Sequence, residues 1–83
     1  MYQAKIYITL RESVLDPQGT AVRKALDAMG YSNIKDVRIG RYLLVDIDTY
    51  DKALAESQAH DMCKKLLANP VIEDYKLEIV KID

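Results

Sequence analysis

The sequence predicts one α+β domain whose elements follow the order βαββαβ, with a four-stranded antiparallel sheet that carries both helices on one face. Three observations lead to this prediction. The chain has 83 residues, which is too short for two cores and long enough for one sheet under one layer of helices. Its apolar side chains recur at every second position in some stretches and at helical spacing in two others. No linker, repeat or low-complexity segment divides the chain, so residues 1–83 form a single domain.

Residues 3–10 are predicted to form the first strand. Apolar side chains occupy every second position there, at Ala4, Ile6, Ile8 and Leu10. The first helix is expected to begin at Asp16, an N-cap followed by Pro17 at the first helical position, where its missing N–H costs nothing. One helical stripe then holds Ala21, Val22, Ala25, Leu26 and Met29. Gly30 suits the left-handed cap position that closes the helix.

Residues 34–48 are predicted to form a β-hairpin. The turn is expected at Gly40 and Arg41, because glycine at the first position of a two-residue loop suits a type II′ turn. The second arm of the hairpin places Leu43, Val45 and Ile47 on one side of the sheet and Tyr42 and Leu44 on the other. This alternation is typical of a strand.

The second helix is expected from about Tyr50 to Ala68, with Asp51 as its cap. Its buried stripe is predicted to contain Ala55, Ala59, Met62, Cys63 and Leu66. Asn69-Pro70 ends the helix, because a residue that precedes proline is pushed out of the α region. Residues 74–82 form the last strand, and the complete order of elements is the ferredoxin-like plan.

The ferredoxin-like plan leaves one face of the sheet without helices, yet apolar side chains occur on both faces of its predicted strands. The last strand, for example, sets Tyr75, Leu77 and Ile79 against Val80 and Ile82. Such a pattern predicts a second protein surface over the open face, most simply a second copy in a sheet-to-sheet homodimer. The candidate contact residues are Tyr7, Tyr42 and Leu44. The alternative is scattered exposed apolar side chains, which are common.

The charge pattern argues against several classes of partner. The formal net charge is −1, from 12 Lys and Arg against 13 Asp and Glu, and the two signs alternate along the chain. Nucleic acids and anionic membranes need clustered basic residues, so neither is an expected partner. No apolar run approaches the roughly 20 residues of a membrane span. The single cysteine, Cys63, has no partner for a disulfide, which fits a reducing, cytoplasmic environment.

The side chains that could carry chemistry are few. His60 is expected on the solvated face of the second helix, and Cys63 lies in its buried stripe, where a reactive thiolate is not expected. Asp46, Asp48 and Asp51 lack the glycine and the bidentate glutamate of a calcium loop. The sequence therefore predicts no catalytic residue, no bound cofactor and no metal site in this chain.

Three polar segments remain without a chemical role. They contribute the candidate partner-interface residues Asp16, Pro17, Gly19, Arg38, Gly40, Arg41, Asn69, Pro70, Val71, Ile72 and Tyr75. Each segment also has a plain reading as a helix cap, a turn or a helix stop. Because all three occur in a chain without catalytic groups, they favour a binding module.

These segments also carry a family resemblance. The stretches "TLRESVLDPQG" (Thr9–Gly19), "DVRIGRY" (Asp36–Tyr42) and "CKKLLANPVIEDY" (Cys63–Tyr75) resemble the PurS family, a subunit of phosphoribosylformylglycinamidine synthase. The resemblance covers essentially the whole chain. One departure is Arg41, where the family more often has lysine after the glycine.

The resemblance implies a non-catalytic assembly subunit for the fourth step of de novo purine synthesis. Such a subunit joins an ATP-dependent synthetase, PurL, to a glutaminase, PurQ, so that ammonia from glutamine reaches formylglycinamide ribonucleotide. It implies a homodimer or a dimer of dimers, with ATP and Mg²⁺ used by the complex and not by this chain. Val71 and Ile72 are then expected to be apolar contacts for assembly, and Arg38 and Arg41 to meet an acidic patch on the synthetase. The alternative is a regulatory domain of ACT-like fold that senses a small metabolite.

Overall fold

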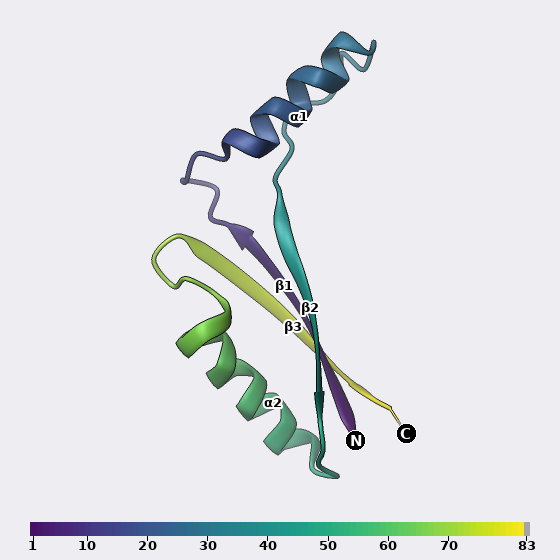
Figure 1. Ribbon diagram of the computed structural model, residues 1–83, viewed down its shortest axis with the longest axis vertical. Helices are drawn as coiled ribbons and strands as arrows, with labels where there is room; N and C mark the ends of the chain where they lie inside the picture. Colours follow the sequence, from purple (N-terminus) through teal and green to yellow (C-terminus); the bar gives the residue numbers. More distant parts are fainter. Residues whose placement is uncertain (83) are drawn as a thin grey trace.

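The computed structural model describes residues 1–82. Its elements are β1 (Tyr2–Leu10), α1 (Pro17–Ala28), β2 (Gly40–Ile47), α2 (Lys52–Met62), the π-helix η1 (Cys63–Leu67) and β3 (Glu73–Lys81). The molecule is elongated, with extents of 50 × 28 × 14 Å, and both chain ends lie at the same end of the sheet (Figure 1). The predicted first strand, both helices and the last strand are thus confirmed, with boundaries that differ by a few residues.

The three strands form one antiparallel sheet in the order β2-β1-β3. Ile6 of β1 lies opposite Leu43 of β2 and Leu77 of β3, so the apolar positions of all three strands share one face. The α2 helix connects the two outer strands and packs against β1 and β3 on that face. The unit β2-α2-β3 with β1 between its strands is the second half of the ferredoxin-like plan.

The prediction of a four-stranded sheet is wrong for the described chain. Residues 34–39, the first arm of the predicted hairpin, have no regular structure, and Gly40 is the first residue of β2, not a turn. A type II′ turn requires a positive φ angle at its first central residue, but the φ angle of Gly40 is not positive. Within residues 1–82 only Gly30 has a positive φ. A Cβ on Gly40 would lie 2.3 Å from the carbonyl oxygen of Ile8. This glycine therefore permits close approach of β1 and β2.

The core lies between the sheet and α2. Its buried members are Ala4, Ile6, Ile8, Ile47, Ala55, Ala59, Cys63 and Ala68. Alanines at 55 and 59 let the helix approach β1 and β3 closely, and Cys63 fills the next turn as a small apolar residue. Packing of this kind explains why α2 forms although most of its polar face is exposed.

The predicted stripe of the second helix is correct except at Leu66, which is 82% exposed. The helix changes from α to π after Met62, and the amide of Ala68 donates to the carbonyl of Cys63, five residues earlier, at 3.0 Å. This wider turn rotates Leu66 away from the sheet and directs Leu67 and Ala68 inward.

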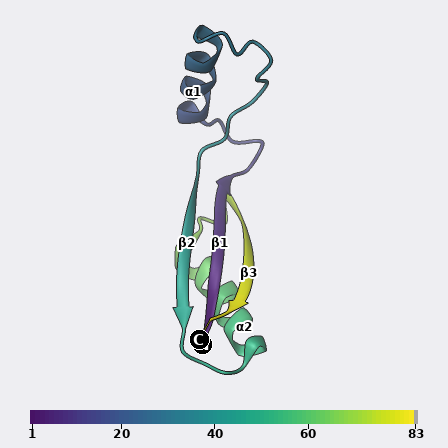
Figure 2. The ribbon, with the colours of Figure 1, turned by 90° about the vertical axis from the view of Figure 1, so that its right-hand side faces the viewer.

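The prediction that both helices cover one face of the sheet is also wrong, because α1 extends beyond the end of the strands (Figures 1 and 2). Asp16 caps the helix and Pro17 begins it, as predicted, and Gly30 follows it with φ +101°. Of its residues only Gly19 is buried, whereas Val22 and Met29 on the predicted apolar stripe are 40% and 70% exposed. Within the described chain, this stripe packs on no strand.

Candidate functional site

The three segments that the sequence analysis singled out meet at one end of the sheet, where β1 ends and β2 and β3 begin (Figure 1). They are joined by polar side chains that we call the strand-end cluster: Arg11, Asp16, Arg38, Arg41, Asn69 and Glu73. Each of these side chains makes a hydrogen bond within the chain. Four of the candidate interface residues therefore have a structural role at this end of the molecule: Asp16, Arg38, Arg41 and Asn69.

Asp16 joins the start of α1 to the chain that enters β2. One carboxylate oxygen accepts from the amide of Gly19 at 2.8 Å, and the other accepts from the amide of Ile39 at 2.8 Å. The residue is only 3% exposed. The Gly19 hydrogen bond, followed by that of Ile39, holds the pKa of this carboxyl below its ordinary value. A Cβ on Gly19 would lie 1.9 Å from the carbonyl oxygen of Val37, so only glycine fits here.

Arg38 holds the link between β1 and α1. Its Nη2 donates to the carbonyl oxygens of Arg11, at 2.6 Å, and Val14, at 3.0 Å. The guanidinium therefore has internal acceptors that the sequence did not reveal, because they are backbone carbonyls some 25 residues away along the chain. A further contact between Arg38 and an acidic patch on a partner stays a prediction.

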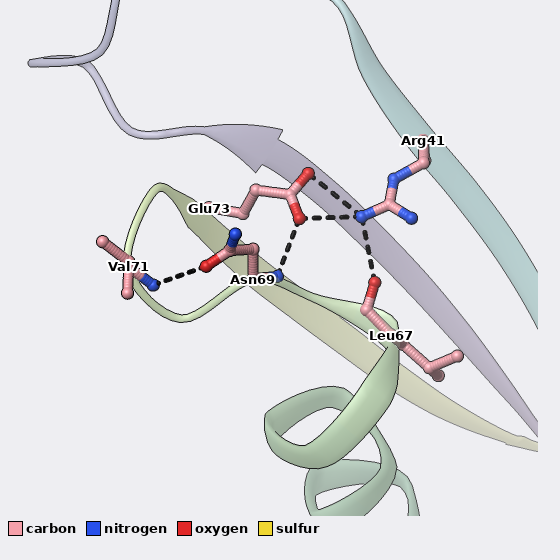
Figure 3. Close-up of polar contacts among 5 residues, drawn as sticks. All are labelled: Arg41, Leu67, Asn69, Val71 and Glu73. Carbon is pink, nitrogen blue, oxygen red and sulfur yellow. Dashed lines mark hydrogen bonds and ion pairs between the residues drawn. The ribbon is translucent and has the colours of Figure 1, made fainter.

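Arg41 reaches from β2 to the chain that leaves η1 and enters β3 (Figure 3). Its Nη2 donates to the carbonyl oxygen of Leu67 at 2.9 Å and to both carboxylate oxygens of Glu73, at 2.8 and 3.0 Å. The same Glu73 carboxylate accepts from the amide of Asn69 at 2.8 Å. The hydrogen bond from the Asn69 amide, together with the interaction with Arg41, holds the pKa of the Glu73 carboxyl below its ordinary value.

Asn69 closes the turn between η1 and β3. Its carbonyl oxygen accepts from the amides of Ile72 and Glu73, at 3.2 and 2.8 Å, and its side-chain oxygen accepts from the amide of Val71 at 3.0 Å (Figure 3). With Pro70 fixing the backbone, these bonds leave little freedom to residues 69–73. Val71 is 76% exposed and Ile72 is 38% exposed at the outer edge of this turn. We call Val71 and Ile72 the apolar tip.

Arg11 supports the same turn from the end of β1, a role that the sequence analysis missed. Its amide donates to the carbonyl of Ile72 at 2.9 Å, and its guanidinium donates to the carbonyl of Pro70 and lies 3.5 Å from Asp74. No local pattern around Arg11 distinguishes it from any solvated arginine after a strand. Its partners become visible only when β1 and β3 are paired.

Tyr75 lies on the inner face of β3 and is partly buried against the core. Its hydroxyl is 3.0 Å from Nδ1 of His60, and the two rings meet edge to face with centroids 5.7 Å apart. The expectation that His60 is simply solvated is therefore wrong. Tyr75 therefore lies behind the turn and is not part of its exposed edge, and its role as an interface aromatic stays a prediction.

The predicted sheet-face residues lie together on the side of the sheet opposite α2. Tyr7 and Tyr42 are directly paired across β1 and β2, and their rings stack with centroids 4.9 Å apart. Leu44 follows two positions along β2 and is 55% exposed. The three side chains are thus contiguous, as the contact prediction requires.

The potential reactive groups have structural surroundings. Cys63 is fully buried, and burial raises the pKa of its thiol, so core packing is confirmed as its role. Among residues 1–82, no three His, Cys, Asp or Glu side chains gather as metal ligands would. None of the helices in that range is long and apolar enough to cross a membrane.

Comparisons with known proteins give a consistent result. Residues 3–81 match a family model described as PurS, phosphoribosylformylglycinamidine (FGAM) synthase. The PurS subunit of Bacillus subtilis phosphoribosylformylglycinamidine synthase is 50% identical over 82 residues, which are 99% of this chain and 96% of that protein. Methanocaldococcus jannaschii PurS, a subunit of formylglycinamide ribonucleotide amidotransferase in purine biosynthesis, superimposes with a TM-score of 0.87 at 36% identity over 100% of both chains. A chain in the PurLQS structure of Thermotoga maritima gives a TM-score of 0.86 at 25% identity and covers 95% of this chain and 96% of its own length.

Proposed function

The chain belongs to the PurS family of phosphoribosylformylglycinamidine synthase subunits, and on this basis we propose that it holds PurL and PurQ together in one complex. The complex transfers ammonia from glutamine to formylglycinamide ribonucleotide in purine biosynthesis. A subunit that contributes no reacting group acts by fixing the two active sites relative to each other, so that ammonia is not lost to water.

The observation that carries this proposal is the apolar tip. Val71 is 76% exposed on a turn whose backbone is fixed by Asn69, Arg11 and the Arg41–Glu73 pair. A rigid turn loses little conformational freedom on binding, so exposed aliphatic side chains on it are effective contacts. In the proposed complex, Val71 and Ile72 enter an apolar pocket of a partner subunit and lose their contact with water.

The test is assembly in solution with the PurL and PurQ subunits of the same organism. Size exclusion with light scattering is expected to show one particle that contains all three subunits only when this chain is present. Val71→Asp and Ile72→Asp are expected to abolish that particle and to leave the circular dichroism of the isolated chain unchanged. Leu66→Asp is the matched control for Val71→Asp, because Leu66, at 82% exposed, is about as exposed as Val71 but lies on η1 and not on the turn.

Two outcomes would contradict the proposal. A wild-type chain that ignores both subunits would remove the assembly function. A large loss of melting temperature in Ile72→Asp, with Val71→Asp still assembling normally, would show that Ile72 is a packing residue and that the tip is not the contact.

We also propose that the chain associates with itself. Within residues 1–82 the α1 stripe has no strand beneath it, and on the inner face β2 is only partly covered, because α2 packs on β1 and β3. In the ferredoxin-like plan a first helix lies at that position. The α1 helix of a second copy can supply it, and the open face with Tyr7, Tyr42 and Leu44 offers a second self-contact. Two different contacts support a dimer of dimers.

ATP and Mg²⁺ are used by the synthetase in this proposal and are not bound by this chain. In this proposal the complex works in the cytoplasm. The buried thiol of Cys63, the only cysteine, is suited to such a reducing compartment.

A further inference from the structure

We propose that Arg41 is a positioning residue, which acts through Glu73 to hold the turn of residues 69–72 in the conformation that presents Val71 and Ile72 to a partner subunit. This inference rests on the proposed assembly function. It differs from the sequence-based expectation that Arg41 itself meets an acidic patch on the synthetase. The two roles make different predictions for the same variants.

The geometry gives Arg41 a specific internal task. A single nitrogen, Nη2, donates to the carbonyl oxygen of Leu67 and to both oxygens of Glu73, so it joins the end of η1 to the start of β3 (Figure 3). The turn that carries the apolar tip lies between these two points. Arg41 therefore fixes both ends of the turn from a third element, β2, which lies across β1 from β3.

Glu73 transmits the position of Arg41 to the turn. Its carboxylate accepts from Arg41 and also from the amide of Asn69 at 2.8 Å, and Asn69 in turn accepts from the amide of Val71 at 3.0 Å. The Glu73 side chain is 16% exposed, whereas that of Arg41 is 54% exposed. The Glu73 carboxylate is little exposed and accepts from two donors, so it keeps one orientation. The chain of hydrogen bonds ends at Val71, the more exposed residue of the apolar tip.

The pair is a different kind of contact from the surface ion pairs of the molecule. Lys65 and Asp61 lie four residues apart on one helix surface at 2.9 Å, with side chains 73% and 59% exposed. Such an exposed pair contributes little to the stability of the fold and does not hold another segment in place. Asp61 and Lys65 therefore provide a matched control for removing one ion pair without disturbing the turn.

A double-mutant cycle tests the proposal. Arg41→Met, Glu73→Gln and the double variant are compared with wild type for affinity toward the PurL and PurQ subunits. Each single variant is expected to weaken binding roughly tenfold or more. The double variant is expected to be no weaker than the worse single variant, because both changes break the same chain of contacts. Lys65→Met and Asp61→Asn are expected to bind as wild type does.

A second readout does not depend on the partners. In the isolated chain, the NMR amide signals of Val71 and Ile72 are expected to shift and broaden in both Arg41→Met and Glu73→Gln. Arg41→Lys, unlike Arg41→Met, is expected to keep the wild-type signals and affinity. All three hydrogen bonds of Arg41 come from one nitrogen, and the ammonium group of lysine can donate three hydrogen bonds.

The outcomes separate this inference from the function on which it rests. If wild type does not bind the subunits, the assembly function fails, and the NMR signals still decide whether Arg41 holds the turn. If wild type binds but the losses of the two single variants multiply in the double variant, Arg41 contacts the partner directly. If the tip signals of Arg41→Met match those of wild type, the positioning role is overturned.

Discussion

At the scale of single residues, the side chains of the strand-end cluster make hydrogen bonds within the chain, whatever contacts they make with a partner. Asp16 and Arg38 use their polar groups on backbone atoms of distant segments. The sequence predicted the local part of this, the cap at Asp16 with Pro17 behind it, because capping depends on residues only three positions apart. It could not predict the bond to Ile39 or the role of Arg11, because those contacts need the strands to be paired first.

Asp16 makes a pH-dependent contribution to stability whose sign follows from its contacts. The hydrogen bonds from Gly19 and Ile39 hold its folded-state pKa below the ordinary value of 3.8, so the unfolded chain takes up a proton first as the pH falls. The stabilisation is therefore complete well above pH 3.8 and is lost as the pH falls through the folded-state pKa.

We expect Asp16→Asn to lower the melting temperature clearly at pH 7, and we expect its difference from wild type to shrink below pH 3.8. Thermal unfolding followed by circular dichroism between pH 2 and pH 7 measures this difference. Asp51→Asn is the control, since Asp51 caps α2 through Leu54 alone, at 3.2 Å, and is exposed. A difference for Asp16→Asn that is constant over the whole pH range would contradict the assigned role of the carboxylate.

At the scale of elements, the sequence predicted periodic segments well and special backbone geometry poorly. β1 and α2 repeat their apolar residues with clear spacing, and both elements are confirmed. Gly40 was misinterpreted, because a glycine that marks a turn and a glycine that lets two strands approach have the same sequence signal. The change from α2 to η1 gave no signal either, since Leu66, Leu67 and Ala68 are all compatible with an ordinary α-helix.

The π-helical turn can be tested by substitutions on its two sides. Leu66→Ser is expected to change the free energy of unfolding by no more than about 0.5 kcal/mol, because the side chain is exposed. Ala68→Leu is expected to cost about 1–3 kcal/mol, because Ala68 is only 6% exposed and a larger side chain overfills the core. Urea unfolding measures both. The opposite ranking would show that the helix continues in the α register through residue 68 in solution.

At the scale of the whole molecule, the chain is more extended than a compact domain of its length. Its radius of gyration is 16.3 Å, whereas a compact domain of 83 residues is expected near 12 Å. The difference arises from α1, which stands beyond the end of the sheet (Figure 1). An isolated helix shorter than about 12–15 residues is marginal in water, and α1 has 12 residues. This is consistent with our proposal that another surface covers Val22, Leu26 and Met29 in the assembled protein.

A second copy is the surface that we propose, and the oligomeric state tests it. Light scattering is expected to give a mass of at least two chains, and X-ray scattering a particle that is compact for that mass. Val22→Asp combined with Met29→Asp is expected to yield monomers with less helical circular dichroism, because α1 frays when nothing covers it. Lys24→Asp combined with Asp27→Lys, at exposed α1 positions off the apolar stripe, is the control and is expected to keep the oligomer. A wild-type monomer that retains its full helix content would show that α1 needs no second chain.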